Sequence, residues 1–252
     1  MNLSLVMKKK LILIYNEGVA GTRSYLRGVI EDIRNYQAFF KSIEGGAWND
    51  AEIKLFHKPS KEDLESYIEE NADSEYFLIV FCGHGGSYDG ETILELDSLI
   101  DLPLGELRGW VKYSRHLIIC DCCREAPEAE PIMESLNERI RMFSQGGTIG
   151  DRLKARNEYQ KAIRATREGA YTVGFAASLG ESAGETSKGG FYSHSLLKAA
   201  SSVAKSGDAG VVSFLQCHYL AEPNVIKLSN DEQHPDYMAL RVKEQLPFVV
   251  KI

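Results

Sequence analysis

Cysteine and histidine side chains follow two apolar runs in the sequence. Residues 77–81 precede the segment CGHGG, which contains His84, and residues 117–120 precede the segment DCCRE, which contains Cys123. Short, β-branched runs of this kind are typical of strands buried on both faces of a parallel sheet. Because functional groups gather beyond the carboxyl ends of such strands, we expect the imidazole and a thiol to lie side by side. A thiol next to an imidazole base can attack a carbonyl carbon.

Three interpretations fit these cysteines and the histidine. Buried cysteines act as small hydrophobic residues, and a histidine can simply occupy a turn. Thiolates and imidazole also bind zinc, but C-x-H and C-x-C-C differ from the paired knuckles of structural zinc sites. The third interpretation is a Cys–His hydrolase, in which imidazole handles the proton and turn N–H groups stabilise the oxyanion. The concentration of these residues at two strand ends favours the hydrolase.

Helical and strand patterns alternate along the chain. This alternation predicts an α/β fold with a mainly parallel sheet and helices on both faces. The expected strands lie at residues 11–15, 51–56, 76–81, 117–120, 170–177 and 246–252, and the expected helices at 25–40, 60–70, 104–111, 191–203 and 211–220.

The composition indicates an ordinary globular protein. The 252 residues are 44% hydrophobic and 26% charged, which is enough for one sizeable α/β domain. The net charge of −7 disfavours nucleic acid as a partner. Five cysteines, most of them at predicted strands, favour reduced thiols and a cytoplasmic setting. The apolar stretch at residues 11–15 is too short for a signal core, and no run has the length of a membrane span.

The two strand-end segments resemble motifs of the caspase–metacaspase clan of cysteine peptidases, family C14. Metacaspases carry a GHG histidine motif and a D-x-C-H-S-G cysteine motif, and caspases carry Q-A-C-R-G. Asp121 matches the metacaspase aspartate and Arg124 matches the caspase arginine, whereas Glu125-Ala126 replaces the terminal glycine. The histidine precedes the cysteine by 39 residues, comparable to the roughly 50 typical of caspases.

The resemblance extends over most of the chain. Residues 26–40 are similar to the first helix of the family, including Gly28 and Asp32, and residues 176–197 are similar to its small-subunit segment. Gln233-His234-Pro235 resembles a Q-x-P motif near the end. The resemblance implies a caspase-like three-layer sandwich with about six strands, forming one structural domain. It also implies a large-subunit-like part (1–126), a linker (127–168) and a small-subunit-like part (169–252), as in a prokaryotic member.

The resemblance also implies a role for each site residue. Cys123 is the expected nucleophile and His84 the expected base and proton donor, while Cys122 occupies the variable position before the nucleophile. The backbone N–H groups of Gly85 and Cys123 would form the oxyanion hole. No third catalytic member is assigned. Two alternatives stay open: a catalytically silent caspase-like scaffold, and a different Cys–His hydrolase such as a thioesterase.

Specificity follows from a comparison of charges. Caspases hold aspartate with two arginines and the glutamine of the cysteine motif. Aligned by hand, these positions fall at Leu26, Glu185 and Asp121, so a cationic pocket becomes an anionic one. Carboxylates pair best with Arg or Lys. The expected partner is therefore a protein or peptide substrate with a basic residue before the scissile bond.

The segment 125–168 is rich in basic residues. A peptidase of this specificity could cut itself there, and the family commonly processes its linker; the candidate positions are Arg141, Arg152, Lys154, Arg156 and Arg164. No metal or other cofactor is expected for the chemistry. Activation would come from the linker, from a partner protein, or from calcium as in many metacaspases. Asp89, Glu91, Glu95 and Asp97 are the acidic residues nearest the histidine motif, but they lack a regular calcium-ligand spacing.

Overall fold

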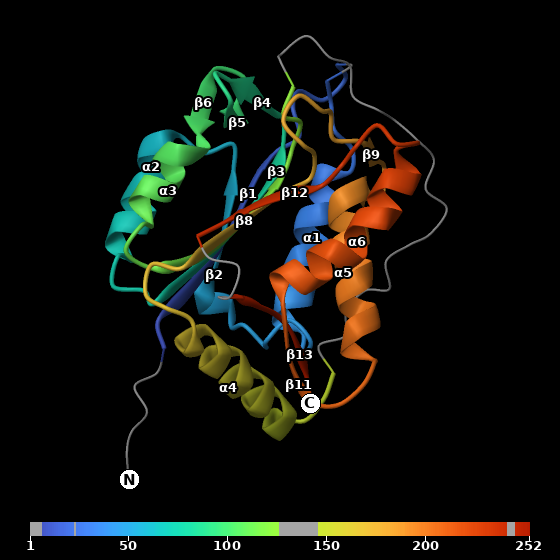
Figure 1. Ribbon diagram of the computed structural model, residues 1–252. Coiled ribbons are helices and arrows are strands. Elements are labelled where there is room, and N and C mark those ends of the chain that lie inside the picture. Colours follow the sequence, from blue (N-terminus) through green and yellow to red (C-terminus); the bar gives the residue numbers. More distant parts are fainter. Residues whose placement is uncertain (1–6, 23, 126–145, 241–244) are drawn as a thin grey trace.

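A six-stranded, mostly parallel sheet forms the centre of the molecule (Figure 1). The computed structural model describes residues 7–22, 24–125, 146–240 and 245–252. The strand order is β12-β8-β7-β3-β1-β2, and only β12 runs antiparallel to its neighbour. The strands are β1 (Lys9–Asn16), β2 (Ile53–His57), β3 (Tyr76–Gly83), β7 (Arg115–Asp121), β8 (Tyr171–Phe175) and β12 (Asp236–Ala239). The prediction of about six mainly parallel strands is confirmed. The expected strand at 246–252 is, however, misplaced, because residues 247–251 pair with residues 210–213 in a separate small sheet.

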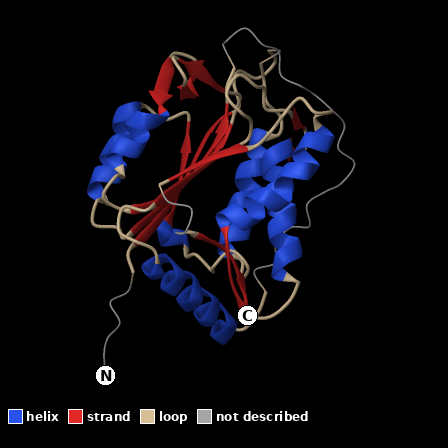
Figure 2. Ribbon diagram, in the orientation of Figure 1, coloured by secondary structure: helices blue, strands red, loops and turns tan. Residues whose placement is uncertain are grey.

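Helices cover both faces of this sheet, so the molecule has three layers (Figure 2). One face carries α1 (Val29–Lys41), α5 (Phe191–Ala204) and α6 (Phe214–Leu228). The other face carries α2 (Lys61–Glu70) and α3 (Leu104–Trp110). The three-layer α/β sandwich expected from the sequence is therefore confirmed.

Side chains of the central strands alternate between two hydrophobic cores. In β3, Leu78 and Val80 pack into the core beneath α1 and α5, whereas Phe77 and Ile79 pack into the core beneath α2 and α3. Both sets are fully buried, and each such side chain contributes about 1.5–3 kcal/mol. Burial on both faces explains why the sequence shows a continuous apolar run rather than an alternating one.

Three small sheets and a short helix complete the fold. They are the antiparallel sheet of β4 (Gly85–Tyr88), β5 (Glu91–Asp97) and β6 (Ile100–Pro103), the pair β9 (Glu185–Thr186) and β10 (Gly189–Gly190), the pair β11 (Gly210–Ser213) and β13 (Pro247–Lys251), and the 3-10 helix Asp50–Glu52. The predicted helix at 211–220 is wrong at its start. Val211 and Val212 lie in β11, and Ser213 caps α6 by accepting a hydrogen bond from Gln216 N.

Part of the expected linker is an ordered helix. Residues Ile149–Ala165 form α4, which packs against β13, and the Tyr159 hydroxyl donates to Pro247 O at 2.9 Å. Ala155, Tyr159 and Ile163 are fully buried. Basic residues of α4 are held by polar contacts: Arg152 with Lys41 O, Arg156 with Glu52 and Arg164 with Glu75. The sequence leaves two interpretations of this segment open, a solvated helical excursion and a protease-sensitive connector. Residues 149–165, which include the candidate positions Arg152, Lys154, Arg156 and Arg164, are helical but packed rather than fully solvated. Arg141 lies outside the described residues.

We predict that α4 resists proteolysis in the native protein. A peptidase needs an extended backbone, so bonds after Arg152, Lys154, Arg156 and Arg164 require α4 to unfold first. Limited trypsin digestion of the Cys123→Ala protein, followed by mass spectrometry, should cut these bonds at least about tenfold more slowly than the same digestion in urea. Equal rates in both conditions would contradict the packed helix.

Candidate active site

Two adjacent strands bring His84 and Cys123 to one edge of the sheet. β3 and β7 pair in parallel, with Cys82 opposite Asp121. His84 and Cys123 each lie two residues beyond this pair, and both line the same cavities. The juxtaposition expected from the strand ends is thus present.

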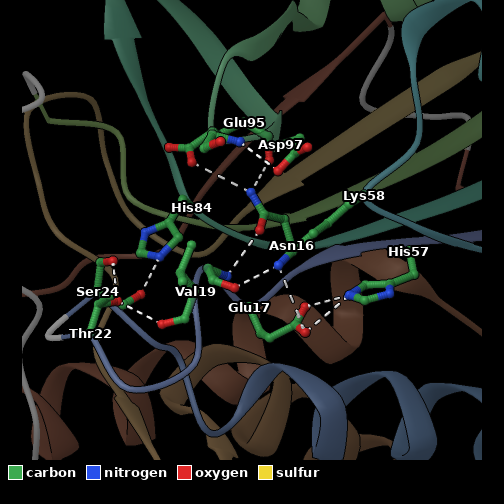
Figure 3. A network of polar contacts seen from close by, with 12 residues as sticks. Asn16, Glu17, Val19, Thr22, Ser24, His57, Lys58, His84, Glu95 and Asp97 are labelled. Carbon is green, nitrogen blue, oxygen red and sulfur yellow. Dashed lines mark hydrogen bonds and ion pairs between the residues drawn. The ribbon is translucent and has the colours of Figure 1, made fainter.

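The loop between β1 and α1 orients the imidazole ring of His84. Its Nε2 lies 2.5 Å from the carbonyl oxygen of Ser24 (Figure 3). A carbonyl oxygen only accepts hydrogen bonds, so Nε2 must carry the proton. In the neutral ring, Nδ1 then carries no proton. Nδ1 is therefore the basic nitrogen. Sequence reasoning missed Ser24, because the group that acts is a backbone carbonyl.

Asn16, at the end of β1, stabilises the β1–α1 loop through side-chain hydrogen bonds. Its side chain is buried, its Oδ1 accepts Gly18 N at 2.9 Å, and its Nδ2 donates to Glu95 O at 3.0 Å. Glu95 N in turn donates to His84 O at 3.1 Å. Lys58 adds a second tie, because its Nζ donates to Gly18 O at 2.6 Å. The backbone of His84 and the loop that holds its ring are thus joined through one buried amide.

Cys123 is held as a neutral thiol. Its Sγ accepts a hydrogen bond from Ala183 N at 3.3 Å. Burial raises the pKa of the thiol above its ordinary value, and the Ala183 N–H and the Ser182 hydroxyl oppose that shift only in part. At neutral pH the sulfur must therefore lose its proton to a base before it attacks.

The neighbouring residues distinguish Cys123 from Cys122. Cys122 is 2% exposed, and burial raises the pKa of its thiol well above the ordinary value. It packs in the core beneath α2 and α3. Gly85, the first residue of β4, lies against it, since a Cβ at Gly85 would stand 2.8 Å from Cys122 Sγ. This contact keeps the Gly85 backbone beside the segment that follows β7, residues 122–125, called the cysteine loop below.

Three carboxylates line the cavity on one side of Cys123. Asp121 ends β7, Asp32 lies in the first turn of α1, and Glu185 begins β9; Leu26 completes this wall. The free space measures about 30 Å³, roughly that of one water molecule. The sequence comparison predicted Leu26, Asp121 and Glu185 here, and the structure brings them together. It did not assign Asp32 to the pocket.

Two helix N-termini face these carboxylates. Asp32 accepts Gly190 N at 2.8 Å and Asp121 accepts Ser193 N at 3.1 Å, both at the start of α5. Glu185 accepts Gly28 N at 3.1 Å, at the start of α1. Helix N-termini favour negative charge. In the part of the chain that the structure describes, Asp32 Oδ1 is buried without a hydrogen-bond partner, so one acceptor stays available.

Burial opposes ionisation of the same groups. Desolvation raises the pKa of Asp121 to about 6 and that of Glu185 to about 7. The pKa of Asp32 also lies well above its ordinary value, first because of burial and then because of the charge of Asp121. The exposed Arg27 lowers the pKa of Glu185 only as a minor cause, and Leu26 rather than Arg27 lines the cavity. Burial and mutual proximity therefore favour the protonated forms of these carboxyl groups more than in water.

Arg124, which matched the caspase arginine, ties the cysteine loop to its surroundings. Its guanidinium donates to Ala177 O and to Asp236, both at 3.1 Å, and it stacks over Phe175. Gln233 acts similarly on the facing loop: its Nε2 donates to Ala176 O and its Oε1 accepts Gly184 N. These two residues position the site from outside it.

The acidic residues considered for calcium lie on the small sheet of β4, β5 and β6. Glu91 accepts Gly105 N, and Asp97 accepts Ser98 N. Among the described residues, no group of three or more His, Cys, Asp and Glu side chains is arranged to hold a metal ion.

The described helices include none long and apolar enough to cross a membrane.

The fold and the Cys–His pair define a caspase-like member of the cysteine peptidases. A caspase domain model matches residues 8–246, and the chain therefore belongs to the caspase domain family, peptidase family C14. Among solved structures it is similar to caspase-1 from Spodoptera frugiperda, with a TM-score of 0.59 and 12% identity over 93% of this chain and 87% of that one. At this identity the similarity concerns the fold alone. A comparison with curated proteins found no match.

We predict that Gly18→Ala lowers kcat at least tenfold with a smaller change in KM. Gly18 has φ of +76°, and a Cβ there would stand 2.9 Å from His84 Nε2 and 2.6 Å from Ser24 O. The new methyl group would displace the ring from its carbonyl partner. The measurement is steady-state hydrolysis of a fluorogenic peptide.

Gly21→Ala is the matched control. Gly21 has φ of +86°, so an alanine there would add a backbone strain similar to that at Gly18, about 1–2 kcal/mol. A Cβ at Gly21, however, meets no atom within 4 Å. We expect it to retain kcat. An equal loss in both variants would show that loop strain, not the contact with His84, is responsible.

Proposed function

We propose that this protein is an active cysteine endopeptidase that cleaves after Arg or Lys. The observation that carries the proposal is the cavity in which Asp32, Asp121 and Glu185 adjoin Cys123 and His84. An anionic pocket beside a nucleophile selects a cationic residue before the scissile bond. Protein or peptide substrates with such a residue are the proposed partners.

The reaction follows from the proton positions. The Cys123 thiol gives its proton to His84 Nδ1 as its sulfur attacks the carbonyl carbon. The Gly85 and Cys123 N–H groups are the proposed donors to the oxyanion. His84 then protonates the leaving amine, the C–N bond breaks and a thioester remains. Water, deprotonated by His84, hydrolyses the thioester and restores the thiol.

A basic side chain enters the pocket only after its walls separate. The present space of about 30 Å³ is too small for a lysine or arginine side chain. Leu26 and the loop that carries Glu185 therefore have to move outward as the substrate binds. The entering cation gains charge-assisted hydrogen bonds of about 1.5–3 kcal/mol each, including one to the unpaired Asp32 Oδ1. The free energy of these hydrogen bonds offsets the cost of opening the pocket.

The proposal also includes a cellular setting and an autocleavage position. The five cysteines are free thiols, which supports a reducing, cytoplasmic setting. Because the basic residues of α4 are held in a packed helix, Arg141 is the autocleavage position that we retain. A catalytically silent scaffold and a non-peptidase hydrolase are the outcomes to test against.

Hydrolysis of peptides with Arg, Lys, Asp or Leu before a fluorogenic leaving group tests this proposal. We expect cleavage after Arg and Lys only, and none in Cys123→Ala. Glu185→Gln should raise KM for the Arg substrate about tenfold or more, because one charge-assisted bond is lost. Preference for Asp would overturn the pocket assignment, and silence on every peptide would favour the scaffold.

The pH dependence of KM provides a second prediction. The raised pKa values of Asp121 and Glu185, about 6 and about 7, mean that both groups are protonated at low pH and ionise as the pH rises. A cationic substrate binds the ionised pocket, so its KM should fall steadily between pH 5 and pH 8. A flat KM over this range, measured with the Arg substrate, would show that these carboxylates do not bind it.

The stability of the folded protein should fall over the pH range in which the affinity for a cationic substrate rises. A carboxyl group with a raised pKa in the folded state stabilises the fold below its unfolded pKa, near 4, and this contribution is lost as the pH rises through 6–7. For Asp121 the contribution is on the order of 3 kcal/mol. Urea unfolding of Asp121→Asn should therefore depend less on pH than that of the parent. Parallel pH profiles for the two proteins would contradict the buried acid.

A further inference from the structure

A second, larger cavity lies on the other side of the catalytic pair. It has a volume of about 340 Å³, roughly that of ten water molecules in the liquid. Its lining comes from the β1–α1 loop, from β5 and from the residue that follows β2, and includes Val19, Lys58, Glu95 and Asp97 beside His84 and Cys123. Figure 3 shows Glu95 and Asp97 on one side of Asn16, with Val19 and Ser24 toward the other.

The two cavities meet at the reacting residues. Of the residues described in their linings, only His84 and Cys123 are common to both. A peptide whose basic side chain fills the carboxylate pocket has its scissile carbonyl at Cys123 Sγ. Its leaving amine must lie next to His84, which protonates it. The residue that follows the scissile bond therefore faces the second cavity.

The fixed charges around the second cavity sum to a negative value. Lys58 is the one cation among the lining residues that the structure describes, against the carboxylates of Glu95 and Asp97; its Nζ donates to Gly18 O and lies 4.0 Å from Glu17. Glu17 is also paired with His57 at 2.9 Å. Within the described part of the chain, Glu95 and Asp97 take part in no ion pair. Their nearest polar contacts are the Asn16 amide and the Ser98 N–H, so both carboxylates can accept further hydrogen bonds.

We propose that this cavity binds a basic residue immediately after the scissile bond, with Glu95 and Asp97 as the residues that set this preference. The enzyme would then cleave between two consecutive basic residues. This inference rests on the proposed function, because the first basic residue occupies the carboxylate pocket. The exposed side chain of Val19, at the rim, would pack against the aliphatic stem of the second one.

Internally quenched peptides with a fixed Arg before the cut test the proposal. The following residue is Lys, Arg, Ala, Leu or Asp, and kcat/KM is measured for each peptide at low and high salt. We expect Lys and Arg to exceed Ala about fivefold, as two partly exposed ion pairs allow, with Asp the poorest. High salt should reduce the preference, because the carboxylates are partly exposed.

The Lys-to-Ala ratio of kcat/KM within each variant separates charge recognition from general damage. The double variant Glu95→Gln with Asp97→Asn should bring this ratio close to one, whatever its absolute rate. Asp101→Asn is the matched control, since Asp101 is exposed on β6 of the same small sheet and lies outside the cavity lining. It should keep the parental ratio.

Each remaining outcome contradicts a particular step. Cleavage of every peptide at equal rates, or a preference for Asp, would overturn the basic preference while leaving the proposed function intact. A double variant that keeps the parental ratio would overturn the assignment of Glu95 and Asp97. Failure to cleave any of these Arg peptides would remove the proposed function and this inference together.

Discussion

The parallel pairing of β3 with β7 is the constraint on which the rest of the site depends. The register that places Cys82 opposite Asp121 also brings the histidine and cysteine that follow them to the same edge of the sheet. Both strands are buried on both faces, so a one-residue slip in register would turn every side chain toward the opposite core, where it would not fit the existing packing. The hydrophobic cores therefore fix the positions of Cys123 and His84. The loops supply only their orientation.

The carboxylate pocket brings three acidic side chains into a buried site, where desolvation opposes their ionisation. Asp32, Asp121 and Glu185 approach one another because the ends of β7, α1 and α5 converge at one point, and the N-termini of both helices favour the ionised forms. Desolvation and mutual repulsion nevertheless keep their pKa values high. Buried carboxyl groups of this kind lower the stability of the folded protein as they ionise toward neutral pH, which is a known cost of functional sites.

Much of the fold and the juxtaposition of Cys123 with His84 could be predicted because the signals are local. The apolar runs before His84 and Cys123 encode buried parallel strands, and the motifs begin where the runs end. Asp121 and Glu185 followed from family resemblance. Asp32 was missed as a pocket residue, because nothing in its own segment indicates that the first turn of α1 meets the end of β7.

Other features escaped sequence reasoning for different physical reasons. The partner of His84 is the carbonyl of Ser24, a group that every residue possesses. The packing of helix α4 was missed because charged residues dominate its composition, so the sequence indicated a solvated helix or a connector. Its buried residues Ala155, Tyr159 and Ile163 do, however, recur every four positions, a helical spacing that carried the signal.

Covalent labelling of the native protein tests the central claim most directly. Two peptidyl acyloxymethyl ketones, identical except for Arg or Asp next to the reactive group, would be offered to the parent and to Cys123→Ala, and the labelled peptide identified by mass spectrometry. The account predicts one adduct on Cys123 from the Arg probe, little reaction with the Asp probe, and no adduct in the variant. Labelling of Cys122, or preference for the Asp probe, would contradict it.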